Sequence, residues 1–235
     1  MTQSEIEPAQ HTAAKVAGVL YLVQMAVAIF GESFVRGRLI VAGDAAQTAQ
    51  NIVAHERLFR LSIAGDLFVY ISVIVLIWTL YVVLRPVNRN LAVLAVILRL
   101  AENAVLCAGT VTAAVALRLL SRPDYLKTFE VSQLQSLAKL ALTTQGLTMN
   151  VAFILLGLGS TVFAYLFLKS HYIPRALAAW GIFASLILAI LTWLIIVFPG
   201  LGTALGLIYM VPMFIYEVGL GLWLVVKGIR EPIST

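Results

Sequence analysis

The chain has 235 residues, of which 61% are hydrophobic and only 11% charged, and its mean hydropathy is +0.98. Soluble domains carry about 25% charged residues, so this composition excludes the water-soluble globular class. The net charge of +5 does not indicate nucleic-acid binding, because the basic residues lie mainly at the ends of apolar segments. The single cysteine, Cys107, excludes an intrachain disulfide and a cysteine metal cluster.

Apolar stretches of roughly 20 residues recur along the chain, and each is long enough to cross a hydrocarbon core of about 30 Å. Backbone groups inside that core must be hydrogen-bonded internally, and the alternation typical of membrane barrels is absent. The sequence therefore predicts an all-α polytopic transmembrane helix bundle, a single transmembrane domain over residues 1–235. Its six expected spans are about 14–30, 58–84, 91–117, 146–168, 176–198 and 204–226.

The connections between spans also carry local signals. Asp44 and Gln47 have capping-box spacing, which predicts a short helix from about residue 45 to 55. Ser132 and Gln135 repeat that spacing and predict a second short interfacial helix before the fourth span. Pro199 and the glycines after it predict a tight turn that makes spans five and six an antiparallel hairpin.

Basic residues in short loops without acids predict the orientation in the membrane. The loops after spans two and four and the C-terminal tail are of this kind, and all three lie on the side of the N-terminus. We therefore expect both termini in the cytoplasm. The basic residues concerned are Arg85, Arg89, Lys169, Arg175, Lys227 and Arg230.

Several stretches together resemble the bacterial DUF4386 family of multi-pass membrane proteins. They are residues 35–46, 51–61, 84–91 and 99–102, and Glu217 followed by residues 222–228. The resemblance covers nearly the whole chain and implies a six-helix protein of a bacterial inner membrane. It implies no activity. The chain departs from the family pattern in its fourth span, where Gln145, Met149 and Asn150 stand in place of histidines.

Ionisable residues within a membrane span are costly and mark candidate functional sites. Arg99 and Glu102 share one helix face and can pair, and their depth in the membrane is similar to that of Glu217 and Asp66. Three carboxylates then face one arginine, so at least one acid should hold a proton or a cation. The expected midplane site for a ligand or a proton comprises Asp66, Arg99, Glu102, Asn103, Asn150 and Glu217.

Two other patterns concern a site at the outer surface and the binding of metals or cofactors. A polar outer site for an anion or lipid headgroup could form, although simple solvation of charged residues at the start of a helix is the simpler explanation. The residues of this outer site are Arg36, Arg38, Glu56, Arg57 and Arg60. No histidine lies within the middle of a span, and no metal-binding motif occurs, so we expect no metal and no resident cofactor.

Three functions remain open at this point. One is a small-molecule or proton-coupled transporter or binder that uses the midplane charges. Another is an intramembrane enzyme acting on a lipid or isoprenoid, and the third is a structural or partner-binding membrane protein. The expected partners are the lipid bilayer and a small-molecule or lipid ligand, and not nucleic acid. The pattern specifies no substrate and no oligomeric state.

Overall fold

The computed structural model describes residues 7–230, and this part of the chain is helical without any strand. Six of its helices are long and apolar enough to cross a membrane, which confirms the predicted all-α bundle. They are Pro8–Leu39, Glu56–Leu84 (α4), Arg89–Leu120 (α5), Val131–Ser170 (α6), Arg175–Val197 (α7) and Ile208–Val226.

The first span extends further than the sequence predicts. Helix α1 (Pro8–Ile29) continues into a π-helix, η1 (Phe30–Arg36), and then into α2 (Gly37–Leu39). The sequence predicts that the span ends near residue 30. The wider π-helical turns instead keep the backbone hydrogen-bonded past Gly31. Arg36 and Arg38 therefore lie on the first span and not in an outer loop, which corrects that expectation.

The short helix after the first span forms as predicted. Helix α3 (Ala45–Ala54) begins after Asp44, whose side chain accepts a hydrogen bond of 2.8 Å from the backbone N–H of Gln47. This bond satisfies one of the N–H groups that a helix start leaves without a partner. The capping residue was therefore identified correctly from the sequence.

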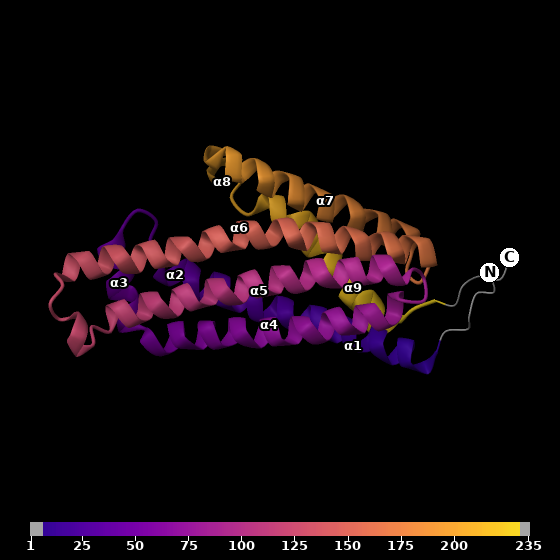
Figure 1. Ribbon diagram of the computed structural model, residues 1–235, viewed down its shortest axis with the longest axis horizontal. Coiled ribbons are helices and arrows are strands. Elements are labelled where there is room, and N and C mark those ends of the chain that lie inside the picture. The colour runs from indigo at the N-terminus through magenta and orange to yellow at the C-terminus, as the bar shows by residue number, and fades with distance from the viewer. Residues whose placement is uncertain (1–6, 231–235) are drawn as a thin grey trace. The chain divides into compact units, whose positions relative to one another are not determined.

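The second interfacial helix is the beginning of α6 rather than a separate element (Figure 1). Helix α6 has 40 residues, which corresponds to about 60 Å of continuous helix. Its start is fixed by the Gln133 side chain, which accepts from the backbone N–H of Glu130 at 3.1 Å. No proline follows before Ser170, so nothing interrupts the helix between the interfacial segment and the span.

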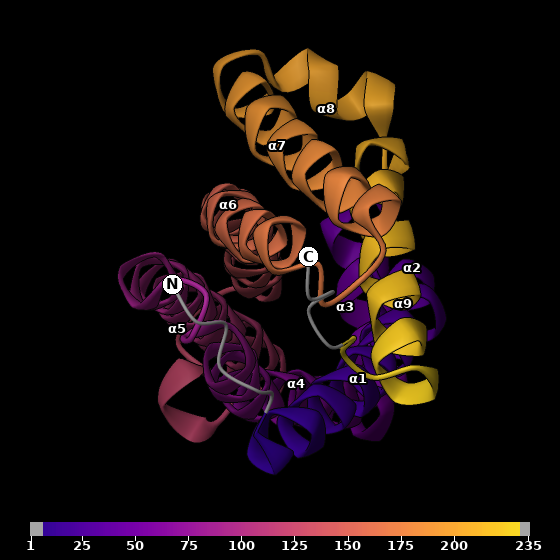
Figure 2. The same ribbon diagram turned by 90° about the vertical axis from the view of Figure 1, so that its right-hand side faces the viewer.

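The last two long helices form the predicted hairpin, but their connection is longer than a tight turn. Pro199 occupies the first turn of an additional helix, α8 (Pro199–Leu205), and Gly206 ends it with a φ of 53°. A 3₁₀ turn, η3 (Ile208–Met210), then leads into α9 (Val211–Val226). Figure 2 shows α7 and α9 side by side, with α8 at one end of the pair.

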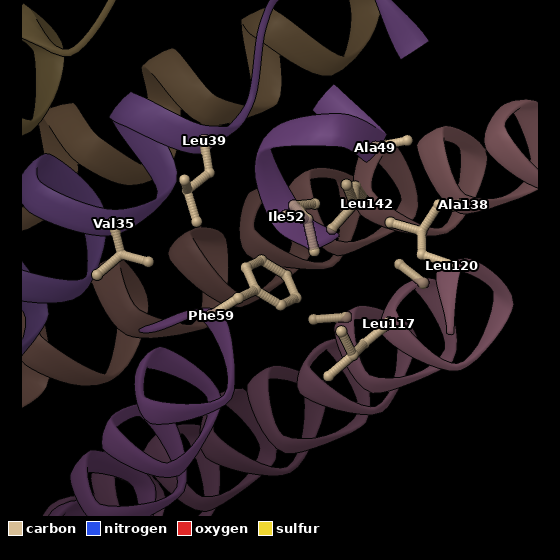
Figure 3. Close-up of a cluster of buried hydrophobic side chains, with 11 residues drawn as sticks. Val35, Leu39, Ala49, Ile52, Phe59, Leu117, Leu120, Ala138 and Leu142 are labelled. Carbon is tan, nitrogen blue, oxygen red and sulfur yellow. The ribbon is translucent and has the colours of Figure 1, made fainter. Parts of the chain in front are cut away.

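The chain divides into two compact units. The first unit comprises Met1–Met25, Ser72–Asn103 and Asn150–Thr235, and the second comprises Ala26–Ile71 and Ala104–Met149. Helices α4, α5 and α6 each contribute one segment to the first unit and one segment to the second. The second unit has an apolar core in which Phe59 and Ile52 lie against Leu117, Leu120 and Leu142 (Figure 3).

Small residues bring helices of the first unit into close contact. A Cβ atom placed on Gly18 of α1 would lie 2.8 Å from the backbone oxygen of Gly221 and 2.8 Å from the backbone nitrogen of Val225, both on α9. Helices without side chains at the crossing can approach until their backbones touch, as small-residue motifs in membranes do. This contact fixes α1 beside α9, the two helices that carry part of the candidate site.

Candidate functional site

The first unit contains a cluster of polar side chains from three helices. Helix α5 contributes Arg99, Glu102 and Asn103, which are only 3–4% exposed. Helix α1 contributes Tyr21 and Gln24, which are three residues apart and therefore on one helix face, and both are buried. Helix α9 contributes the buried Tyr216 and the half-buried Glu217.

The centre of this cluster is an ion pair within α5. Arg99 Nη1 lies 3.1 Å from Glu102 Oε2, at the i, i+3 spacing that the sequence predicts. Neither of these two atoms makes a hydrogen bond, although both are buried. The pair is thus held by charge while part of its hydrogen-bonding capacity stays unused, which is costly in a membrane interior.

Gly159 of α6 sets the position of the Arg99 side chain. A Cβ atom on Gly159 would lie 2.9 Å from Arg99 Cγ and 3.1 Å from its Cδ. The arginine stem therefore lies directly against the α6 backbone, in space that only glycine leaves open. The sequence pattern gives no sign of this role, because Gly159 lies within an apolar span.

Glu217 is the second carboxylate of the cluster. It interacts electrostatically with Arg99, Glu102 and Tyr21. Within residues 7–230 no lysine, arginine or histidine forms an ion pair with Glu217, whereas Glu102 has Arg99 as its direct partner. The cluster therefore combines two carboxylates with one guanidinium, and two tyrosine rings lie beside them.

The surroundings of Glu217 are fixed by contacts between α7 and α9. A Cβ atom on Gly181 of α7 would overlap the ring of Tyr216, so this ring fits tightly against the α7 backbone. The Trp180 indole N–H donates to the backbone oxygen of Pro212 at 3.1 Å. Pro212 lies in the first turn of α9, where no helical hydrogen bond is lost. A proline at this position does not kink α9 beside Glu217.

Gln24 adds a donor to the first-unit cluster. Its side-chain nitrogen Nε2 is buried and has no hydrogen-bond partner among the described residues. Buried amides are normally hydrogen-bonded, and an unpaired donor costs about 1–3 kcal/mol. The residue thus offers a free N–H group close in sequence and on the same helix face as Tyr21. Asn150, also expected at the site, lies half-buried on α6 in this unit.

Asp66 belongs to the second unit, where its partner is Arg36. The side chains of both residues are 14% exposed, and Glu32 lies 3.6 Å from the same guanidinium. The predicted spans leave Asp66 without a basic partner, because the first of them ends before Arg36. The i, i+4 spacing of Glu32 and Arg36 was the available signal that this segment is helical.

The predicted outer polar residues do not form one common cluster. Arg36 is half-buried beside Asp66, while Arg38 lies over the ring of Phe34 at 5.3 Å. Arg60 and Glu56 form an exposed pair at 2.7 Å, and Arg57 is exposed beside them. Exposed pairs of this kind contribute at most about 1 kcal/mol, so they do not by themselves define a site.

The donor set limits the chemistry of these clusters. Among the described residues, no group of three or more histidine, cysteine, aspartate or glutamate side chains could hold a metal ion. The first-unit cluster contains acids, one guanidinium, phenols and carboxamides. Such groups can exchange a proton and can hydrogen-bond a polar molecule.

Comparison with known proteins gives one match. The sequence model of a domain of unknown function, DUF4386, matches residues 16–228. No curated protein and no solved structure matches the chain.

Proposed function

We propose that this chain, which belongs to the DUF4386 family, is a proton-coupled transporter or binder of a small molecule, with Glu217 as its proton-binding residue. The six apolar helices make it a multi-pass membrane protein. The proposal depends on one observation: Glu102 and Glu217 share the single guanidinium of Arg99, and only Glu102 contacts it directly.

Charge balance gives the physical reason. A carboxylate inside a bilayer is costly unless it is paired, and the attraction of Arg99 is already used by Glu102. Glu217 becomes neutral if it takes up a proton, and it becomes paired if a cationic substrate group reaches it. Proton and substrate would then compete for one carboxylate, which is the simplest way to couple their movements.

Infrared spectroscopy tests the proton site directly. A protonated carboxyl has a carbonyl stretch that is separate from the carboxylate bands, so a pH titration of the purified protein counts buried protonated acids. Near neutral pH, where exposed acids are ionised, we expect one such band; it should be lost at alkaline pH in the wild-type protein and be missing near neutral pH in Glu217→Gln.

Two variants serve as controls for this titration. Glu130→Gln removes an exposed acid at the start of α6, and Asp66→Asn removes an acid that Arg36 already pairs. Both should keep the band. A band that persists in Glu217→Gln, or that disappears in Asp66→Asn, would assign the proton elsewhere and refute the proposal.

Coupling is measured in proteoliposomes, as substrate uptake with and without a proton gradient. Uptake should follow the gradient in the wild-type protein and become independent of it in Glu217→Gln. A purely structural role for the cluster makes a different prediction: Glu217→Gln would change the yield of folded protein and leave gradient dependence unchanged.

We further propose that the protein lies in the cell membrane with both termini in the cytoplasm. The support is the distribution of basic residues in the short connections that lack acids. Arg85 and Arg89 flank the turn between α4 and α5, and Lys169 and Arg175 flank the turn between α6 and α7. Cytoplasmic loops carry such an excess of lysine and arginine.

A further inference from the structure

The second unit contains a groove of about 260 Å³ between α4 and α5. Four residues on each side line it at i, i+3, i+4 and i+7 spacing, which is the pattern of one continuous helix face. The lining residues are Arg60, Ile63, Ala64 and Leu67 on α4, Ala114, Leu117 and Arg118 on α5, and Ser121 directly after the end of α5.

The groove changes from basic to apolar along its length. Arg60 lies four residues from the start of α4, and Arg118 lies two residues from the end of α5. Leu67 lies seven residues further along α4 than Arg60, which is about 10 Å deeper in the span. Ala64 and Ala114 have only a methyl side chain, which leaves space along the apolar part.

The residues that line the basic end of the groove include two arginines and no acid. Arg60 and Arg118 are both exposed, and Arg60 also pairs with Glu56 at 2.7 Å. Arginine binds phosphate oxygens through two parallel hydrogen bonds, and it does so better than lysine. An apolar helix seated here would bury two arginines against hydrocarbon, which is costly.

We propose that this groove binds an anionic phospholipid, with its phosphate at Arg60 and Arg118 and an acyl chain along Ile63, Leu67 and Leu117. The volume supports a chain rather than a compact molecule, because pockets for whole small ligands measure about 300–1,000 Å³. Charge complementarity selects the headgroup, and the apolar lining selects a lipid over a free phosphate ion. This site is independent of the Glu217 cluster.

Native mass spectrometry of the detergent-purified full chain measures the binding. Phosphatidylglycerol, phosphatidylcholine with the same acyl chains, and inorganic phosphate are titrated separately. Each arginine near a lipid surface contributes about a fivefold change in affinity. We expect preference for phosphatidylglycerol, and roughly 25-fold weaker binding in the double variant Arg60→Gln/Arg118→Gln. Arg57→Gln, an exposed residue of α4 outside the groove, should leave binding unchanged.

A second variant distinguishes the contribution of the acyl chain to binding from that of the headgroup. Ala114→Phe keeps both arginines and fills the apolar part of the groove, so it should weaken phosphatidylglycerol binding without affecting inorganic phosphate. Equal affinity for the two lipids would overturn the headgroup assignment, and indifference to Ala114→Phe would overturn the acyl-chain assignment. If the double variant fails to fold, the two single variants replace it, and unchanged affinity in both would refute the site.

Discussion

Arg99 is the residue on which the first-unit cluster depends electrostatically. Its guanidinium contacts Glu102 and interacts with Glu217 and Tyr21, and its stem lies against Gly159. Removing one partner of a buried ion pair leaves the other charge uncompensated, whereas removing both partners costs much less. The cluster is therefore more sensitive to losing its cation than to losing the pair as a whole.

A double-mutant cycle measures this dependence. Arg99→Leu should lower the free energy of unfolding by about 3–5 kcal/mol, because Glu102 then stays buried without a cation. Arg99→Leu/Glu102→Leu should recover most of that loss. Thermal or denaturant unfolding in detergent gives the three values. Additive effects of Arg99→Leu and Glu102→Leu would show that the 3.1 Å pair contributes no coupling.

At the scale of elements, the contact between α1 and α9 decides whether Tyr21 and Glu217 can lie in one cluster. At the centre of this contact Gly18 meets the backbone at Gly221 and Val225, and the Cβ of Leu224 lies beside them. A methyl group here meets backbone atoms at 2.8 Å, and backbone atoms cannot rotate away as side chains do. The helices must separate to accommodate it.

Gly18→Ala should therefore destabilise the protein by about 1–3 kcal/mol and shift the infrared band of Glu217, since α1 moves away from α9. The matched control is Gly146→Ala on α6, where an added Cβ meets no atom within 4 Å. Alanine is a better helix former than glycine, so Gly146→Ala should stabilise the protein slightly, by up to about 1 kcal/mol. The same loss of stability in both variants would contradict the packing argument.

The elements also show what sequence patterns predict well. Long apolar runs and a local cap depend on neighbouring residues, so the sequence predicts the six spans and the capping role of Asp44, although the first span ends later than predicted. The partner of Asp66 depends on a π-helical segment that carries Arg36 onto the first span, and the i, i+4 spacing of Glu32 and Arg36 indicates a helix there without specifying the π-helix. The packing of Arg99 on Gly159 joins residues 60 positions apart, and a single sequence does not contain that information.

At the scale of the whole molecule, the order of the helices and the basic residues between them predict one orientation in the membrane. Helix α5 is the most direct place to test it, because its 32 residues extend about 48 Å and its two ends must lie on opposite sides. Asn90 near its start and Ser121 just after its end are both exposed. Arg85 and Arg89 mark the Asn90 side as cytoplasmic.

Cysteine labelling in intact cells measures this orientation. Cys107 is the only native cysteine, so Cys107→Ala gives a background without thiols into which Asn90→Cys and Ser121→Cys are introduced one at a time. A membrane-impermeant maleimide should label Ser121→Cys in whole cells and label Asn90→Cys only after the cells are opened. The reverse pattern would place both termini outside. Labelling of both positions in intact cells would mean that α5 does not span the membrane, and the energetic argument for Glu217 as a membrane-embedded acid would lose its basis.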